Sequence, residues 1–153
     1  MNPAEALLNY PFGDALPEPG SALEVAPGLK WIRMSLPFAL DHINLWLLRD
    51  RIDGPDGPRD GWTVVDCCVD LPAAREQWEQ VFECALEGLP IVRVIATHMH
   101  PDHLGLAHWL CDRWNAVLWI SATDYYTALA ASSGTLFPKA DELSAFYRSH
   151  GIA

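Results

Sequence analysis

The chain has 153 residues, half of them apolar, which suits one domain with a substantial hydrophobic core. Its formal net charge is −10, and its isoelectric point is about 4.8. A surface this acidic repels phosphate backbones and anionic lipid, so we expect neither nucleic acid nor membrane as a partner. No apolar run approaches the ~18 residues of a membrane span, and the N-terminus lacks the basic start and apolar core of a secretory signal.

The first part of the chain predicts an irregular arm followed by a hairpin. Residues 1–21 are rich in proline and glycine and show little periodicity, so the domain is expected to span residues 22–153. Within it, Pro27-Gly28 separates two strand-like segments. A proline followed by a glycine suits the two central positions of a type II turn, which predicts a hairpin.

Two further strands are predicted before the pattern changes. They cover residues 42–49 and 62–66, and the glycine-, proline- and aspartate-rich segment 50–61 between them is expected to be a loop. After these strands the apolar period becomes helical within residues 70–90, and Gly88 and Pro90 end that helix.

The remainder alternates between strands and helices, which predicts an α/β layered fold. Residues 91–97 are β-branched and typical of a buried strand. The later elements are expected as a helix over 104–114, a strand over 116–120, and helices over 121–132 and 140–151.

Four cysteines, Cys67, Cys68, Cys84 and Cys111, form neither a C-x-x-C pair nor a dense disulfide pattern. We therefore expect reduced thiols and a cytoplasmic location. The adjacent Cys67 and Cys68 invite a redox interpretation, but burial as inert side chains explains them better.

Near the middle of the chain, the segment THMHPDHLG (Thr97–Gly105) places three histidines and an aspartate within six residues. His98 and His100 are two apart at the end of a strand, so both imidazoles point to the same side. Asp102 and His103 follow in the turn that leads to the next helix. Because α/β sheets usually bind ligands at the carboxyl ends of their strands, these side chains are expected to converge there.

This cluster suits a site shared by two metal ions. A structural zinc site is a poor match, because such sites favour cysteine and take their ligands from two separated segments. The cluster can instead supply half of the ligands of two ions roughly 3.5–4 Å apart, as in two-metal hydrolytic sites. By chance, H-x-H-x-D-H would arise roughly once in a thousand chains of this composition, so a metal site explains it better than a surface histidine cluster.

The cluster resembles the H-x-H-x-D-H signature of the metallo-β-lactamase superfamily, and the glyoxalase II-like branch of small cytoplasmic hydrolases looks closest. Two other segments agree: VAPGLKWIRM resembles the opening strands of that fold, and WTVVD resembles its strand that ends in an aspartate before the first helix. The similarity runs from about Ala22 to the end of the chain. It implies the N-terminal half of an αββα sandwich, a mixed sheet flanked by helices.

The resemblance also assigns roles to the cluster. It implies that His98 and His100 bind the first metal ion and that Asp102 and His103 bind the second. Asp102 would be the catalytic residue, orienting a metal-bridging hydroxide that attacks a carbonyl. Asp66 would brace the metal loop by hydrogen bonding without binding metal. The implied activity is metal-dependent hydrolysis of a small thioester, ester or lactone, with zinc as the expected metal and iron or manganese as alternatives.

The family's remaining ligands, a third histidine, a bridging aspartate and a last histidine, normally come from the second half of the domain. After His103 the chain has only His108 and His150. His108 falls within the predicted helix and is expected to turn away from the site. His150 ends a helix without the glycine-rich strand of a late ligand, so both are better explained as solvated or core histidines. His42 lies either at the mouth of the pocket or at a strand end.

Several explanations of the incomplete ligand set stay open. The sequence is a fragment of a longer enzyme, a truncated gene product, or a half-domain completed by another chain. In the last two cases the chain would be catalytically inactive by itself and would bind metal weakly. A sheet face without its partner would leave a large apolar patch, which favours a homo-oligomer or association with the missing C-terminal half.

Overall fold

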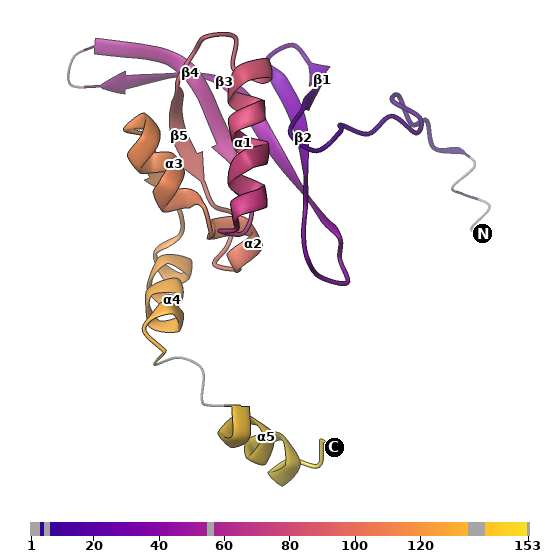
Figure 1. Cartoon of the computed structure of the whole chain (residues 1–153), viewed down its shortest axis with the longest axis vertical. Coiled ribbons are helices and arrows are strands. Elements are labelled where there is room, and N and C mark those ends of the chain that lie inside the picture. Colours follow the sequence, from indigo (N-terminus) through magenta and orange to yellow (C-terminus); the bar gives the residue numbers. More distant parts are fainter. Residues whose placement is uncertain (1–3, 5–6, 55–56, 135–139, 153) are drawn as a thin grey trace.

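The computed structural model describes residues 4, 7–54, 57–134 and 140–152, and it contains one mixed six-stranded sheet (Figure 1). The strands lie in the sheet in the order of the sequence. They are β1 (Ala22–Ala26), β2 (Leu29–Ser35), β3 (His42–Gly54), β4 (Gly57–Val65), β5 (Ile91–Ile95) and β6 (Val117–Trp119).

Five helices belong to the described residues, and none of them is both long enough and apolar enough to cross a bilayer. They are α1 (Pro72–Ala85), α2 (Pro101–Leu104), α3 (Ala107–Trp114), α4 (Ala122–Ser132) and α5 (Ala140–Ser149). The alternation of strands and helices after β4 is the predicted one. Residues 8–21, before β1, lie in turns and irregular backbone.

The first four strands are antiparallel, and the predicted hairpin joins β1 to β2 at Pro27-Gly28. Gly28 adopts a φ of +72°, a conformation in which side chains other than glycine are strained. The register of β2 against β3 runs without interruption from Leu29↔Leu48 to Ser35↔His42.

The predicted loop over residues 50–61 is wrong, because β3 and β4 pair as a ribbon as far as Gly54 and Gly57. In the described part of the chain, this ribbon extends past the residues at which β2 and β5 pair with it. Pro58 therefore lies on an edge, where a missing N–H group breaks no ladder of hydrogen bonds. The glycines and prolines mark the tip of a hairpin instead of a loop.

The last two strand pairs, β4–β5 and β5–β6, are parallel. Their connections place α1 and α3 on the same face of the sheet (Figure 1). The core lies between these helices and the sheet, and Trp78 of α1 is fully buried in it. Its indole N–H donates to the Cys67 carbonyl at 2.9 Å, so α1 also holds the segment that follows β4. Burial of such a side chain contributes about 1.5–3 kcal/mol.

The face of the sheet opposite α1 and α3 carries a row of apolar side chains and is partly exposed. The register places Trp46, Val65, Ile95 and Trp119 in one row across four strands, and cross-strand neighbours share a face. Trp31 stacks on Trp46 with ring centroids 6.3 Å apart, and Trp119 is 54% exposed. This row is an apolar surface of the kind that other protein segments cover.

At Gly61 the backbone of β4 lies very close to Pro90, the residue before β5. A Cβ atom at Gly61 would lie 2.4 Å from the Pro90 carbonyl oxygen and 2.5 Å from Val92 Cγ1. That oxygen accepts a hydrogen bond from the Trp62 N–H at 2.9 Å, so it cannot withdraw freely. We expect Gly61→Ala to lower the free energy of unfolding in urea by about 1–3 kcal/mol. The neighbouring control Asp60→Ala, at an exposed position, should change it by less than ~0.5 kcal/mol, and equal values for the two variants would contradict this packing.

Candidate metal centre

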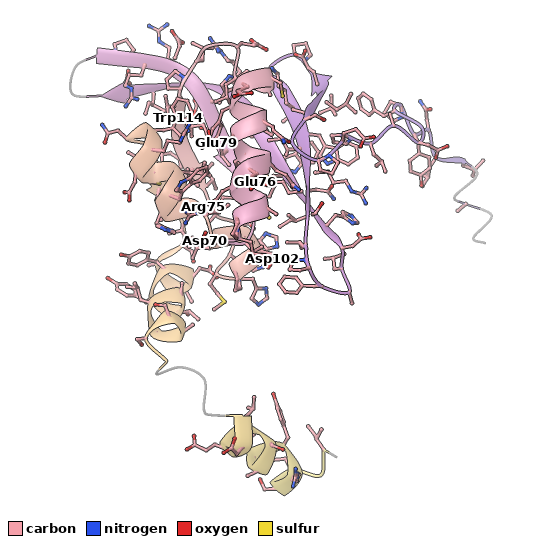
Figure 2. All side chains as sticks on the ribbon, in the orientation of Figure 1. Asp70, Arg75, Glu76, Glu79, Asp102 and Trp114 are labelled. Carbon is pink, nitrogen blue, oxygen red and sulfur yellow. The ribbon has the colours of Figure 1, made fainter. Side chains whose placement is uncertain are left out.

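The candidate site lies where two parallel strands end side by side. β4 is followed by Asp66 and β5 by Thr97, and the Asp66 N–H donates to the carbonyl of Ile95 at 2.8 Å. Because parallel strands run in the same direction, the side chains that follow them meet at one edge of the sheet. Figure 2 shows Asp102 of α2 at this edge, near the start of α1.

The Asp66 carboxylate joins the two strand ends to the histidine cluster. It accepts hydrogen bonds from the Thr97 N–H at 2.7 Å, from the Thr97 hydroxyl at 2.8 Å and from His103 Nδ1 at 2.7 Å. Asp66 is only 6% exposed and has a φ of +59°, a conformation that aspartate and asparagine tolerate better than most residues. Since a carboxylate is its partner, His103 Nδ1 carries the proton, and the Nε2 lone pair is left for another ligand.

The four residues of the cluster lie together, as predicted, and form two pairs. His98 Nε2 is 2.9 Å from His100 Nδ1, and His103 Nε2 is 3.3 Å from the nearer carboxylate oxygen of Asp102. The rings of His98 and His103, which come from different pairs, have centroids 4.0 Å apart. Two ligand atoms at zinc distances on a tetrahedral ion are separated by about 3.3 Å, so the spacing within each pair is close to that of two ligands of one ion.

The histidine and carboxylate donors suit metal ions, but the described residues supply too few ligands to complete the coordination of an ion. Among the described residues, no group of three or more histidine, cysteine, aspartate or glutamate side chains is arranged to hold an ion. Two pairs of donors, one next to the other, supply two ligands each. An ion at either pair would need further ligands to complete a tetrahedral set.

A closely packed backbone fixes the loop that carries the cluster. The Cys67 N–H donates to the His103 carbonyl at 2.9 Å, and the Leu106 N–H donates to the Cys68 carbonyl at 3.1 Å. Gly105 is required between them, because a Cβ there would lie 2.5 Å from the carbonyl oxygen of Pro101. Asp102 and His103 thus lie in the short helix α2, and not in the turn that the sequence predicts.

Cys67 and Cys68 are fully buried with free thiols, as the sequence predicts for inert side chains. Burial raises the pKa of the Cys68 thiol from 9.0 to about 11, and it also raises the pKa of Cys67 well above its ordinary value. Both thiols therefore stay protonated at neutral pH, which is unfavourable for nucleophilic or redox chemistry.

Asp124 is a contributor that the sequence analysis missed. Its carboxylate accepts a hydrogen bond from the Met99 N–H at 3.2 Å, and Met99 stands between His98 and His100. Asp124 lies in the first turn of α4, where the Ser121 side chain accepts from its backbone N–H at 3.0 Å. The signal available in the sequence was the S-x-x-D spacing of a helix-capping box.

The remaining histidines lie outside the cluster. His108 is on α3 with its side chain 64% exposed, and its nearest recorded partner is Asp70 at 4.0 Å. His150 follows α5, where its Nδ1 lies 2.9 Å from the carbonyl oxygen of Phe146. His42 begins β3 and pairs with Asp41 at 2.6 Å. Contact with the cluster is recorded for none of the three in the described part of the chain.

A model of one family, the metallo-β-lactamase superfamily, matches residues 40–148. The chain belongs to the metallo-β-lactamase superfamily. This confirms the family resemblance seen in the H-x-H-x-D-H segment and in the strands that precede it. The mixed sheet flanked by helices is the N-terminal half of the superfamily's fold, as predicted.

Solved structures share the fold of this chain. The chain is 54% identical to a β-lactamase domain protein from Burkholderia ambifaria, with a TM-score of 0.75, over 82% of this chain and 37% of that one. A metallo-β-lactamase family protein from Thermus thermophilus is 24% identical, with a TM-score of 0.58, over 85% of this chain and 40% of that one. The chain thus spans about two fifths of the length of these relatives. A comparison with curated proteins found no match.

Asp66→Asn tests whether this carboxylate supports the metal ligands. Asparagine tolerates the positive φ and keeps the shape of the side chain, but it removes the charge that fixes His103. We expect zinc affinity to fall about 10–100-fold in competition with a chromophoric chelator. The matched control is Asp70→Asn, because Asp70 is half-exposed and binds Arg75 on the surface. Zinc binding that is unchanged in Asp66→Asn would contradict the bracing role.

Proposed function

We propose that the protein is a metal-dependent hydrolase that acts on a small thioester, ester or lactone. The observation that carries the proposal is the pair of donor sets that follows β5, His98 with His100 and Asp102 with His103. Membership of the superfamily supports a hydrolase fold, and superfamily members generally depend on metal. The substrate is a proposal from the chemistry of the site.

Each residue of the cluster has a distinct task in this proposal. His98 Nε2 and His100 Nδ1 would hold one ion, while Asp102 and His103 Nε2 would hold the second. Asp102 would also orient the attacking water and accept its proton. Asp66 keeps the proton on His103 Nδ1, so that Nε2 presents its lone pair to the ion.

Zinc is the proposed metal, because imidazole and carboxylate donors suit it, and iron or manganese would also be accepted by this set. When bound, zinc supplies carbonyl polarisation and a nucleophilic water at neutral pH. The net charge of −10 and the free cysteines favour a small-molecule substrate in the cytoplasm over a nucleic-acid substrate. The ligands that complete each ion would come from a segment other than the described residues.

Variants of the cluster test the hydrolase proposal directly. With zinc added, we expect His98→Ala and Asp102→Asn each to lower kcat/KM for thioester or lactone hydrolysis by about 10²–10⁴-fold. His98→Ala removes a metal ligand, and Asp102→Asn removes the proton acceptor. His150→Ala is the matched control, since His150 is exposed at the end of α5. Activity that survives at the wild-type rate in both cluster variants would disprove the assignment.

The second candidate is a catalytically inactive half-domain that binds metal weakly or pairs with another chain. Two observations favour it: the described residues supply only two ligands at each donor pair, and the apolar row that includes Trp119 stays partly exposed. A completed unit would then consist of two polypeptides or of a homo-oligomer. Association with the second chain would then supply the missing metal ligands and cover the exposed row of apolar side chains.

Native mass spectrometry of the zinc-loaded protein separates the two candidates. The hydrolase proposal expects two zinc ions in each completed unit, whether that unit is a longer chain or an assembly. His98→Ala should lose one of these ions, because it removes half of the first donor pair. A monomer of about 17.0 kDa without metal would favour the inactive half-domain.

A further inference from the structure

We propose that a groove beside the histidine cluster binds an unbranched aliphatic acyl chain, which would make the substrate a fatty acyl thioester or ester. This inference rests on the proposed hydrolase function and narrows its substrate class. The groove lies between α2, α3 and α4, and Figure 1 shows α4 next to the end of the sheet that carries α2.

The groove consists of two adjoining hollows. The first is a cavity of about 390 Å³, within the usual size range of ligand pockets. A second hollow of about 380 Å³ adjoins it, and one of its lining residues is His100 of the cluster. The residues that line both hollows are Met99, Pro101, Ala128 and Ser132. The two hollows therefore adjoin each other, and His100 places the second hollow beside the cluster, so a chain attached to a carbonyl near His100 would point toward the cavity.

The chemistry of the cavity lining selects an apolar ligand. Leu104, Leu118, Ala128 and Leu129 contribute aliphatic surface, and none of the cavity's lining residues, all within the described part of the chain, is an aspartate, glutamate, lysine or arginine. This is unusual on a protein with a net charge of −10. His108, Tyr125 and Ser132 are the polar exceptions in the lining, and over the aliphatic part of the surface each methylene gains by leaving water.

Asp124 keeps the groove next to the cluster. Its hydrogen bond to the Met99 N–H joins the first turn of α4 to the segment between His98 and His100. The same helix then presents Ala128 and Leu129 to the cavity. This hydrogen bond thus joins the helix that lines the groove to the segment that carries His98 and His100.

The test measures binding without using catalysis. Butanamide, hexanamide and octanamide are neutral, resist hydrolysis and differ only in chain length. In calorimetric titrations of the metal-free protein, we expect affinity to rise by up to about fourfold for each added methylene. Ala128→Trp should abolish this dependence by filling both hollows. The matched control Ala130→Trp lies on the same helix but outside the groove lining, so it should keep the dependence.

A second measurement uses the wild-type protein, so its result does not depend on whether a variant folds. With methyl-labelled methionine, octanamide should shift the NMR signal of Met99, which lines the groove. Met34 provides the internal control, because it is fully buried in the core. An unchanged Met99 signal, or affinity that does not depend on chain length, would overturn the proposal and would mean that another protein segment fills the groove.

The two proposals fail in different ways. If octanamide binds as expected but zinc-loaded protein hydrolyses neither acetyl nor octanoyl thioesters, the hydrolase function fails while the aliphatic site stands. If hydrolysis occurs at equal kcat/KM for acetyl and octanoyl thioesters, the hydrolase function stands and the acyl site is overturned.

Discussion

The Asp66 carboxylate is the interaction on which the rest of the site depends. It bonds to Thr97 at the end of the neighbouring strand and to His103 in the following helix. Asp66 is 6% exposed, and its hydrogen bonds to Thr97 and His103 satisfy the buried carboxylate. One buried side chain therefore ties the loop after β5 to the end of β4 and holds the ring of His103.

The sheet places the Asp66 carboxylate within hydrogen-bonding distance of Thr97 and His103. β4 and β5 run parallel and end together, so Asp66 and Thr97 are neighbours although they are 31 residues apart. α1 fixes the segment after β4 through Trp78, whose indole donates to the Cys67 carbonyl. The segment that carries Asp66 is thus attached to α1. The opposite face carries the row of apolar side chains in which Trp119 is exposed.

The two donor pairs and the groove lie next to each other at one edge of the sheet. Hydrogen bonds from neighbouring protein groups orient one histidine of each pair: Thr97 contacts His98, and Asp66 contacts His103. Asp124 couples them to α4 and hence to the groove. Ligand positions, substrate orientation and metal affinity should consequently change together when Asp66 or Asp124 is altered.

The sequence by itself determined the cluster, the alternation of strands and helices, and the family. These features are local: His98, His100 and His103 are neighbours in the chain, and apolar periodicity reports which face of an element is buried. Only the tertiary structure decided that residues 50–61 form a ribbon and that Asp124 supports the loop between the histidines. Cross-strand pairing and contacts between distant residues depend on how elements pack, and packing leaves no periodic signal in a single sequence.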